Sequence, residues 1–397
     1  MKTITKIMIS MTAALAVCSC GGRQTAETVP AINPENLDTS VAPGQDFYAY
    51  ATGGWQKNNP LKPEFSRYGA FDVLAENNQI RLNDLFKGLA DMQTREGSVE
   101  RKIADLYTMG LDSLRRNEEG ITPILPFIKE LDSVTDLESF AKASAECELN
   151  GVSSVWAAYA TADMMDSSTQ VLYIGQSGLR LGNRDYYLLP QHEALRKGYR
   201  DYLEKIFTLA GFEDAAVIAD DAFGVEMALA IPYWSMVQQR DVQAQYNPMS
   251  SEQLAQTYPN LYFAKVLEVL GIAPQEKLIV EQPSYFAAIN DILAATDPVK
   301  LRHYLQANLL SGACAFVSDE YYTASFEFFS KQMAGAQEPT PLWKRAMSVP
   351  NSLLGEAVGK MYVERYFPEE NKTKMLEIVG NLKKVMDGEE IGTLVHN

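Results

Sequence analysis

Apolar residues recur at helical spacing along most of the chain. Over residues 74–92, for example, Leu82, Leu85, Phe86 and Leu89 are separated by charged and polar positions, which is the pattern of an amphipathic helix. The same spacing predicts further helices over residues 101–116, 121–131, 141–149, 193–209, 215–230, 284–295, 300–310, 316–333, 353–366 and 369–386.

Two stretches depart from this helical pattern. Residues 152–160 and 169–175 are rich in Val, Tyr, Ile and Ser with partial alternation, and a polar turn separates them, so they predict a β-hairpin. Residues 277–280 predict a short third strand. No repeat of 20–50 residues is visible, which disfavours a solenoid. The sequence therefore predicts a mainly α fold, with one large multi-helix domain and a small β-hairpin element.

Composition narrows the function classes. The 397 residues are 46% hydrophobic and 22% charged, as in a globular protein, and the net charge is −16. Because no run of Lys or Arg interrupts this negative charge, the phosphate-backbone attraction that nucleic-acid binding needs is missing, and we expect no nucleic-acid partner. The same charge repels anionic membranes, so membrane attachment has to be covalent or through a partner.

The first residues supply such an attachment. Lys2 and Lys6 precede a short apolar run, and Cys18-Ser19-Cys20 follows it, which is similar to a bacterial lipoprotein signal. We favour Cys20 as the lipidated residue because small Ser19 precedes it. The alternative is an ordinary secretory signal. The expected organisation is a signal peptide over residues 1–20 and a flexible polar tether over 21–36, with the protein lipid-anchored in a bacterial cell envelope, facing the periplasm or at the outer membrane.

The segment from residue 43 to residue 72 is unusually aromatic. Asp46 is a predicted helix cap, Phe47, Tyr48 and Tyr50 follow it within one turn, and Gly53 is a predicted helix stop. This is more aromatic surface than a solvated segment needs, so it should pack against another part of a complete protein. The stretch 66–72, with sequence SRYGAFD, then leads into the helix over 74–92.

This segment resembles the N-terminal part of the neprilysin-like zinc metallopeptidases, of the bacterial oligopeptidase type. Four later motifs resemble the family in the same order. They are the RDYY turn at 184–187, the RD…YN segment at 240–247, the W-K-R motif at 343–345 and the G-x-x-Y-V…F helix at 355–367. The resemblance covers residues 37–386, which we expect to be the family's N-terminal domain.

The resemblance also implies what lies beyond this domain. In the family, the zinc site belongs to a C-terminal lobe that supplies an HExxH helix and a downstream glutamate ligand, and no HExxH occurs in this chain. Residues 387–397 no longer resemble the family and read as an aberrant tail. We therefore expect a chain truncated before the catalytic lobe and inactive alone, with no catalytic or metal-binding residue of its own. Zinc is implied for the full-length enzyme only.

The chemistry-bearing residues within the chain fit this expectation. A hydrolytic zinc site needs about three protein ligands. His192-Glu193 begins like half of an HExxH, but Arg196 stands at the fourth position, so this pair reads as the polar start of a helix. His303 reads as a surface or paired core histidine. Cys147 and Cys314 could form a disulfide in an oxidising compartment, but two buried free thiols are the preferred interpretation.

Arg67, Phe71 and Asp72 are the candidate substrate-binding residues. By resemblance, the arginine points into the cavity between the lobes and binds the free carboxylate of a short peptide, while Phe71 forms an apolar subsite wall and Asp72 a neighbouring polar position. The mammalian enzyme has a second arginine eight residues further on, where this chain has Ala75. The alternative, equally open, is that Arg67 simply pairs with an acid such as Asp72.

Two functions remain open from the sequence. In the first, the chain is the cavity-forming part of a zinc metalloendopeptidase acting on short peptides, with a separately encoded catalytic lobe as a candidate partner. In the second, it is a non-catalytic envelope lipoprotein that binds peptides or a partner protein. Neither function includes nucleic acid, and both use the membrane only through the lipid anchor.

Overall fold

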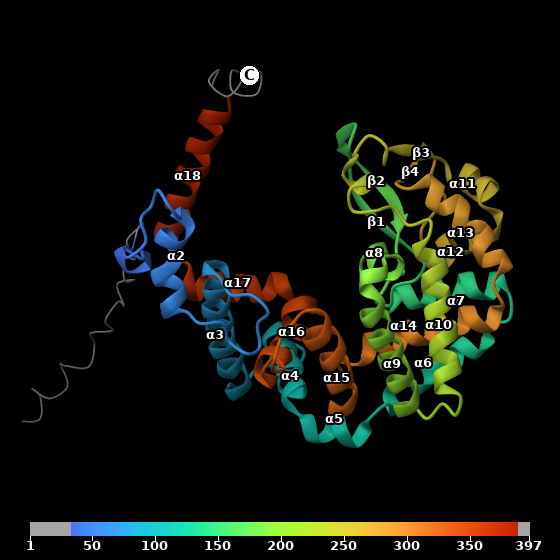
Figure 1. Cartoon of the computed structure of the whole chain (residues 1–397), viewed down its shortest axis with the longest axis horizontal. Coiled ribbons are helices and arrows are strands. Elements are labelled where there is room, and N and C mark those ends of the chain that lie inside the picture. The colour runs from blue at the N-terminus through green and yellow to red at the C-terminus, as the bar shows by residue number, and fades with distance from the viewer. Residues whose placement is uncertain (1–32, 388–397) are drawn as a thin grey trace, which may run out of the picture. The chain divides into compact units, whose positions relative to one another are not determined.

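The computed structural model describes residues 33–387 and divides into two compact units at Lys62 and Pro63 (Figure 1). The boundary between these units lies within residues 37–386, the range expected to form the N-terminal domain. The predicted signal peptide, Cys20, most of the tether and residues 388–397 lie outside the described residues. The last tether residues form a short 3-10 helix, η1 (Pro34–Asn36), capped by Asn33.

Among its described residues, 33–62, the first unit contains one α-helix, α2 (Phe47–Asn58), which Asp46 caps as predicted by accepting a hydrogen bond from the Ala49 N–H (2.9 Å). The predicted stop at Gly53 is wrong, because the helix continues as far as Asn58. The glycines instead allow close approach of the preceding chain. A Cβ on Gly54 would collide with the carbonyl oxygen of Glu35.

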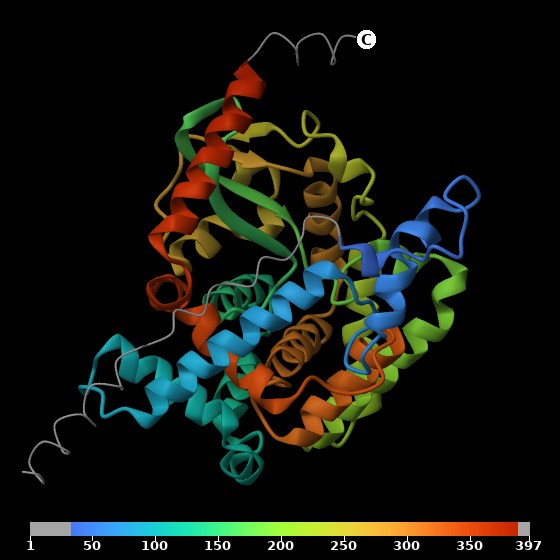
Figure 2. The ribbon, with the colours of Figure 1, turned by 90° about the vertical axis from the view of Figure 1, so that its left-hand side faces the viewer.

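The second unit is mainly α-helical, as predicted. Its first region is made by four helices packed side by side: α3 (Ala70–Asp91), α4 (Val99–Leu111), α16 (Leu342–Leu353) and α17 (Gly355–Tyr366). We call it the four-helix region. Figure 2 looks onto α3 with the orange-red helices beside it. Its own apolar core includes Phe86, Ile103, Tyr107, Met347 and Val358.

A much larger core lies among the remaining helices and the sheet, and we call this the main core. The helices that contribute to it are α6 (Leu125–Glu130), α7 (Leu137–Leu149), α8 (Arg184–Leu188), α9 (Glu193–Leu209), α10 (Ala215–Ala230), α11 (Ser251–Thr257), α12 (Phe263–Val269), α13 (Pro283–Ala295), α14 (Pro298–Ala313), α15 (Asp319–Ser325) and the π-helix η7 (Phe326–Met333). Helix α5 (Ser113–Glu119) precedes them in the chain and has no buried residue. The short 3-10 helices are η2 (Thr122–Ile124), η3 (Leu131–Ser133), η4 (Pro190–His192), η5 (Gln238–Arg240) and η6 (Pro259–Leu261). Helix α18 (Glu369–Asp387) closes the described chain.

Most predicted helices occur within a few residues of their expected bounds, and three were expected to be continuous α-helices but are not. The helix predicted over 121–131 consists of η2, α6 and η3. The helix predicted over 101–116 breaks at Asp112, whose carboxylate accepts a hydrogen bond from the Arg115 N–H (3.0 Å) and so starts α5 afresh. The helix predicted over 316–333 begins only after Ser318 and changes from α15 into η7 at Phe326.

The predicted hairpin and third strand are confirmed as part of a four-stranded sheet, in the order β1-β2-β4-β3. Strands β1 (Trp156–Asp163) and β2 (Asp166–Gln176) are antiparallel, and β4 (Leu278–Val280) runs parallel to β2. The edge strand β3 (Asn247–Met249) was not predicted, because it has three residues and Pro248 at its centre. No helix among the described residues is long and apolar enough to cross a membrane.

Candidate functional site

The candidate substrate-binding residues lie at the start of α3. Gly69 adopts an extended conformation just before the helix, and its carbonyl accepts hydrogen bonds from the N–H groups of Asp72 (3.0 Å) and Val73 (3.1 Å). In return, the Asp72 carboxylate accepts a hydrogen bond from the Gly69 N–H (2.8 Å). This reciprocal pairing fixes where the helix begins and gives the Asp72 side chain a structural partner.

The loop before the helix is held by a buried lysine. The Lys344 ammonium, on α16, lies 3.5 Å from a carboxylate oxygen of Glu64 and 3.2 Å from one of Glu76. It also lies 5.2 Å from the ring centre of Phe65. Since Lys344 is only 8% exposed and contacts groups on both sides of the loop, it ties residues 64–76 to α16.

The side chains of Arg67, on this anchored loop, and Phe71, at the helix start, are exposed to solvent. Arg67 is exposed and has no hydrogen-bond or ion-pair partner in the part of the chain that the structure describes. The alternative that Arg67 pairs with Asp72 is therefore not what the structure shows. Phe71 is 88% exposed, and Ala75, one turn further along the same helix face, is exposed too. The arrangement offers an uncommitted guanidinium beside an apolar ring.

The RDYY turn belongs to the main core. Asn183 caps α8 by accepting a hydrogen bond from the Asp185 N–H (3.0 Å), and Arg184 donates to the carbonyl of Tyr233 (2.7 Å). Tyr187 is fully buried, and its hydroxyl donates a hydrogen bond to the carboxylate of Glu226. This motif therefore organises the interior.

Glu226 is the centre of this interior network. It is fully buried, and its carboxylate also accepts hydrogen bonds from the Tyr199 hydroxyl (2.7 Å) and the Arg180 N–H (3.2 Å). Burial raises the pKa of Glu226 above its ordinary value, and these donors oppose the rise. Burial together with the nearby Glu226 carboxylate raises the pKa of both tyrosines well above 10.0.

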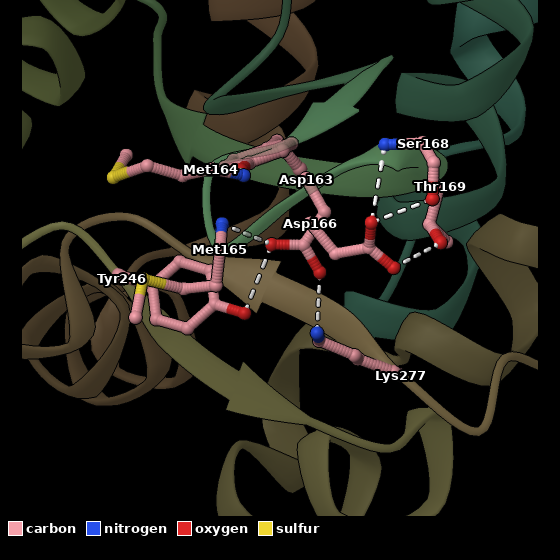
Figure 3. A network of polar contacts seen from close by, with 9 residues as sticks. Asp163, Met164, Met165, Asp166, Ser168, Thr169, Tyr246 and Lys277 are labelled. Carbon is pink, nitrogen blue, oxygen red and sulfur yellow. Dashed lines mark hydrogen bonds and ion pairs between the residues drawn. The ribbon is translucent and has the colours of Figure 1, made fainter.

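The RD…YN segment reaches the tip of the hairpin. Figure 3 shows the Asp163 carboxylate accepting hydrogen bonds from the Tyr246 hydroxyl (3.0 Å), the Met165 N–H (2.9 Å) and the Lys277 ammonium. The Lys277 hydrogen bond is the main cause that lowers the pKa of Asp163, whose side chain is 1% exposed. Asn247 donates to the carbonyl of Val280 (3.0 Å), which fixes β3 beside β4. This motif is also structural.

The family-like motif on α17 is hydrogen-bonded to α3. The Tyr362 hydroxyl donates a hydrogen bond to the Asn78 side-chain oxygen (2.8 Å) and accepts one from Arg81 (3.2 Å). Trp343, Tyr186 and Phe367 are half-buried, as side chains that serve packing are. Of the motif residues, Arg67 and Phe71 are the pair that is exposed at a helix start.

Metal-donor residues are dispersed in the described part of the chain. His303 pairs with Asp221 (3.0 Å), which also binds Lys300, and His192 packs edge-on against Tyr186 just before α9 begins. Within residues 33–387 no three His, Cys, Asp or Glu side chains are grouped so that they could hold a metal ion. The donor set of these residues therefore does not fit a hydrolytic zinc ion.

The two cysteines of the folded body are free and buried, as preferred from the sequence. Burial raises the pKa of the Cys147 thiol to about 12 and that of Cys314 to about 11. Cys314 lies 3.4 Å from the Tyr202 hydroxyl. At neutral pH both remain thiols, which neither bind metals nor attack substrates well.

The sequence places this chain in a known family. The profile of Peptidase family M13, for the N-terminal part, matches residues 43–389. Because this match covers most of the chain, the protein belongs to this neprilysin-like family and comprises its N-terminal domain.

Individual relatives agree with this assignment. Mouse endothelin-converting enzyme 1 is 28% identical over 373 residues, which are 90% of this chain and 48% of the relative. Human endothelin-converting enzyme-like 1 is 25% identical over 370 residues, 88% of this chain and 47% of the relative. The chain thus spans about half the length of the curated relatives it matches.

Solved structures confirm the fold. Zinc metalloprotease ZMP1 of Mycobacterium tuberculosis, in complex with an inhibitor, superposes with a TM-score of 0.85 at 26% identity, over 90% of this chain and 55% of that one. PepO of Lactobacillus rhamnosis HN001 superposes with a TM-score of 0.75 at 20% identity, over 86% of this chain and 54% of that one, and at this identity supports the fold alone.

Proposed function

We propose that this chain forms the peptide-binding side of a zinc metalloendopeptidase that acts on short peptides, and that Arg67 binds the C-terminal carboxylate of the peptide. The observation that carries the proposal is the exposed Arg67 guanidinium, which has no partner among residues 33–387 and lies at the start of α3 with the exposed ring of Phe71. Family membership supports the reaction class.

The chemistry follows from the geometry of the guanidinium. Its planar fork binds both oxygens of a carboxylate at once, so it recognises the end of a peptide and thereby sets the distance from that end to the cleaved bond. One such contact contributes about 1.5–3 kcal/mol, which is enough to select free C-termini but not to bind a peptide alone. Phe71 would contact an apolar side chain near this terminus. Asp72 would act as a neighbouring polar position that also holds the helix start.

The carboxylate contact can be tested with two peptides. A five-residue peptide with a free C-terminal carboxylate and its C-terminal amide would be titrated against the purified chain. We expect the free acid to bind about tenfold more tightly, since an amide lacks the charge. Arg67→Gln should remove this preference, whereas Arg101→Gln, on an exposed α4 arginine paired with Asp105, should retain it. Equal binding of acid and amide to the unchanged chain would refute the role of Arg67.

The same proposal includes a prediction about catalysis. Because the sequence has no HExxH and residues 33–387 do not group metal donors, we expect the purified chain to lack peptidase activity by itself. A fluorogenic peptide incubated with the chain, with added zinc or with a zinc chelator, checks this. Zinc-dependent, chelator-sensitive cleavage would show that the zinc ligands are within the chain after all.

We further propose that Cys20 anchors the protein to a bacterial envelope membrane. The support is the order of Lys2, the apolar run and the Ser19-Cys20 pair at the start of the sequence. Metabolic labelling with an alkyne fatty acid should label the chain, Cys20→Ala should abolish the label, and Cys18→Ala should leave it. The reverse pattern would move the anchor to Cys18, and labelling of neither form would favour an ordinary secretory signal.

A further inference from the structure

A cavity in the second unit has the features of a ligand site. It has a volume of about 590 Å³ and lies where the end of α4, α5, the start of α15 and α16 meet (Figure 1). Cavities of about 300–1,000 Å³ are typical for small ligands. This cavity is entirely within the second unit and its lining does not include Arg67 or Phe71.

The close crossing of α4 and α16 forms one side of the cavity. A Cβ on Gly110 would lie 2.8 Å from the Cα of Ala346, so the two backbones touch at this point. The Gly110 carbonyl accepts a hydrogen bond from Arg116 (3.2 Å), which also pairs with Asp319 at 3.0 Å. The position of this wall is therefore fixed by backbone contact and by a bridged, largely buried arginine.

Four cations line the cavity, and three of them are neutralised. Arg115 pairs with Glu119 (2.7 Å), Arg116 pairs with Asp319, and Lys344 lies between Glu64 and Glu76. Arg345 differs from these three, because none of the ion pairs among the described residues includes it. Its guanidinium group therefore makes no direct ion pair there, although its charge contributes to lowering the pKa of nearby Asp319.

The surroundings of Arg345 are also preorganised. Its guanidinium carbon lies 3.8 Å from the ring centre of Tyr322, a stacked arrangement that fixes the plane of the group. Its Nε atom is buried and has no hydrogen-bond partner in the described part of the chain. Because Nε is closed off from solvent, a ligand in the cavity would meet the terminal Nη atoms instead, and these also make no hydrogen bond within the described residues. The partner that matches a guanidinium edge is a carboxylate.

The apolar residues that line the cavity indicate the second chemical feature of the ligand. Leu106 and Leu342 contribute apolar surface, and Met109 and Phe316 line the same cavity while remaining 62% and 63% exposed. Large apolar side chains at the opening of a cavity favour an apolar group there. The ligand class is therefore a small molecule with one carboxylate and one apolar side chain.

We propose that this cavity, with Arg345 as its anion-binding residue, is a second ligand site that takes a small apolar carboxylate such as an N-acylated apolar amino acid. Arg345 is the last residue of the W-K-R motif at 343–345, to which the sequence alone assigned no binding role. The proposal does not depend on the peptide-binding role of Arg67, since neither Arg67 nor Phe71 lines the cavity, although Lys344 both lines it and holds the loop that carries Arg67.

The probes for the test are N-acetyl-L-leucine and its neutral isostere N-acetyl-L-leucinamide. Each would be titrated into the purified chain carrying ¹³C-methyl methionine, with the methyl signal of Met109 assigned through Met109→Leu. We expect the acid to shift the Met109 signal saturably and the amide to bind at least about tenfold more weakly. The exposed hairpin methionines Met164 and Met165 should show no shift.

Three variants distinguish binding in the Arg345 cavity from binding at Arg67. Arg345→Met should weaken acid binding at least about tenfold, and Arg345→Lys should restore only part of it because lysine lacks the planar fork. Arg67→Gln should leave the Met109 titration unchanged, so failure of the Arg67 proposal and failure of this one are distinguishable. Equal shifts by acid and amide, unchanged affinity in a folded Arg345→Met, or no saturable shift of Met109 would each overturn the proposal.

Discussion

The centre of the main core and the start of α3 in the four-helix region differ in whether their side chains are used by contacts within the chain. In the main core, Glu226 is fully buried, and its carboxylate is matched by two tyrosine hydroxyls and a backbone N–H. In the four-helix region, α3 leaves Phe71, Leu74 and Ile80 between 52% and 88% exposed. Its neighbouring Arg67 has no partner among the described residues.

This difference separates motifs that fold the protein from motifs that are available for ligands. Tyr187 and Tyr246, from two of the family-like motifs, use their hydroxyl groups on buried carboxylates of the same chain. Such groups are occupied and cannot also bind a substrate. Arg67 and Phe71 make no comparable contact within the chain. Their side chains are therefore not explained by a role in folding, whereas a role in ligand binding does explain them.

The largest loss of stability should come from removing the buried Glu226 side chain from the main core. Glu226→Ala leaves the Tyr187 and Tyr199 hydroxyls and the Arg180 N–H without their acceptor and creates a cavity. We expect the free energy of unfolding to fall by about 3–5 kcal/mol. Urea denaturation followed by circular dichroism would measure it. A loss below about 1 kcal/mol would mean that the network contributes little.

The same residue gives a pH test. Because burial raises the pKa of Glu226, the folded chain keeps this proton at pH values where the unfolded chain has lost it. The resulting stabilisation is complete below the ordinary value of 4.5 and is lost as the pH rises through the raised pKa. Glu226→Gln cannot titrate, so its stability relative to the unchanged chain should improve as the pH rises above 4.5. A constant difference across this range would contradict the assignment.

An intermediate effect is expected where the four-helix region is tightly packed. Gly110→Ala places a Cβ against the backbone of Ala346 and should destabilise the chain by about 1–3 kcal/mol, because α4 has to move away from α16. Gly88→Ala is the matched control. It lies inside α3 and has no atom within 4 Å of the place that an added methyl group would take, so it should be neutral or stabilising by up to about 1 kcal/mol. Thermal unfolding of both variants checks the contrast.

The sequence predicted the fold class well because helices leave a clear periodic signal. The bounds of α10 were predicted without error, since its apolar residues fill the expected positions throughout. The hairpin was also predicted. Periodicity could not show the break at Asp112, because the break depends on one side-chain hydrogen bond. It also could not show β3, because this strand depends on pairing with β4, which is distant in the sequence.

The candidate site was predictable only in part. The resemblance to the family pointed to Arg67 and Phe71, but whether Arg67 pairs with Asp72 depended on which N–H the carboxylate contacts, and the sequence left this open. Glu226 and the Arg345 cavity were missed. The sequence signal for Glu226 was a single acidic residue in the otherwise apolar stretch 222–230 of α10, whereas the cavity arises from the crossing of helices that are far apart in the sequence.

The smallest effect should come from removing an apolar side chain that the fold does not use. Phe71→Ala takes away a ring that is 88% exposed, so the free energy of unfolding should change by no more than about 0.5 kcal/mol. Phe86→Ala, on the same helix but fully buried beside Tyr107, is the matched control and should cost about 3–5 kcal/mol. Chemical denaturation of the two variants compares one residue type in two settings on one helix. If Phe71→Ala destabilised the chain as much as Phe86→Ala, then Phe71 would be a folding residue, and its assignment to a peptide subsite would lose its basis.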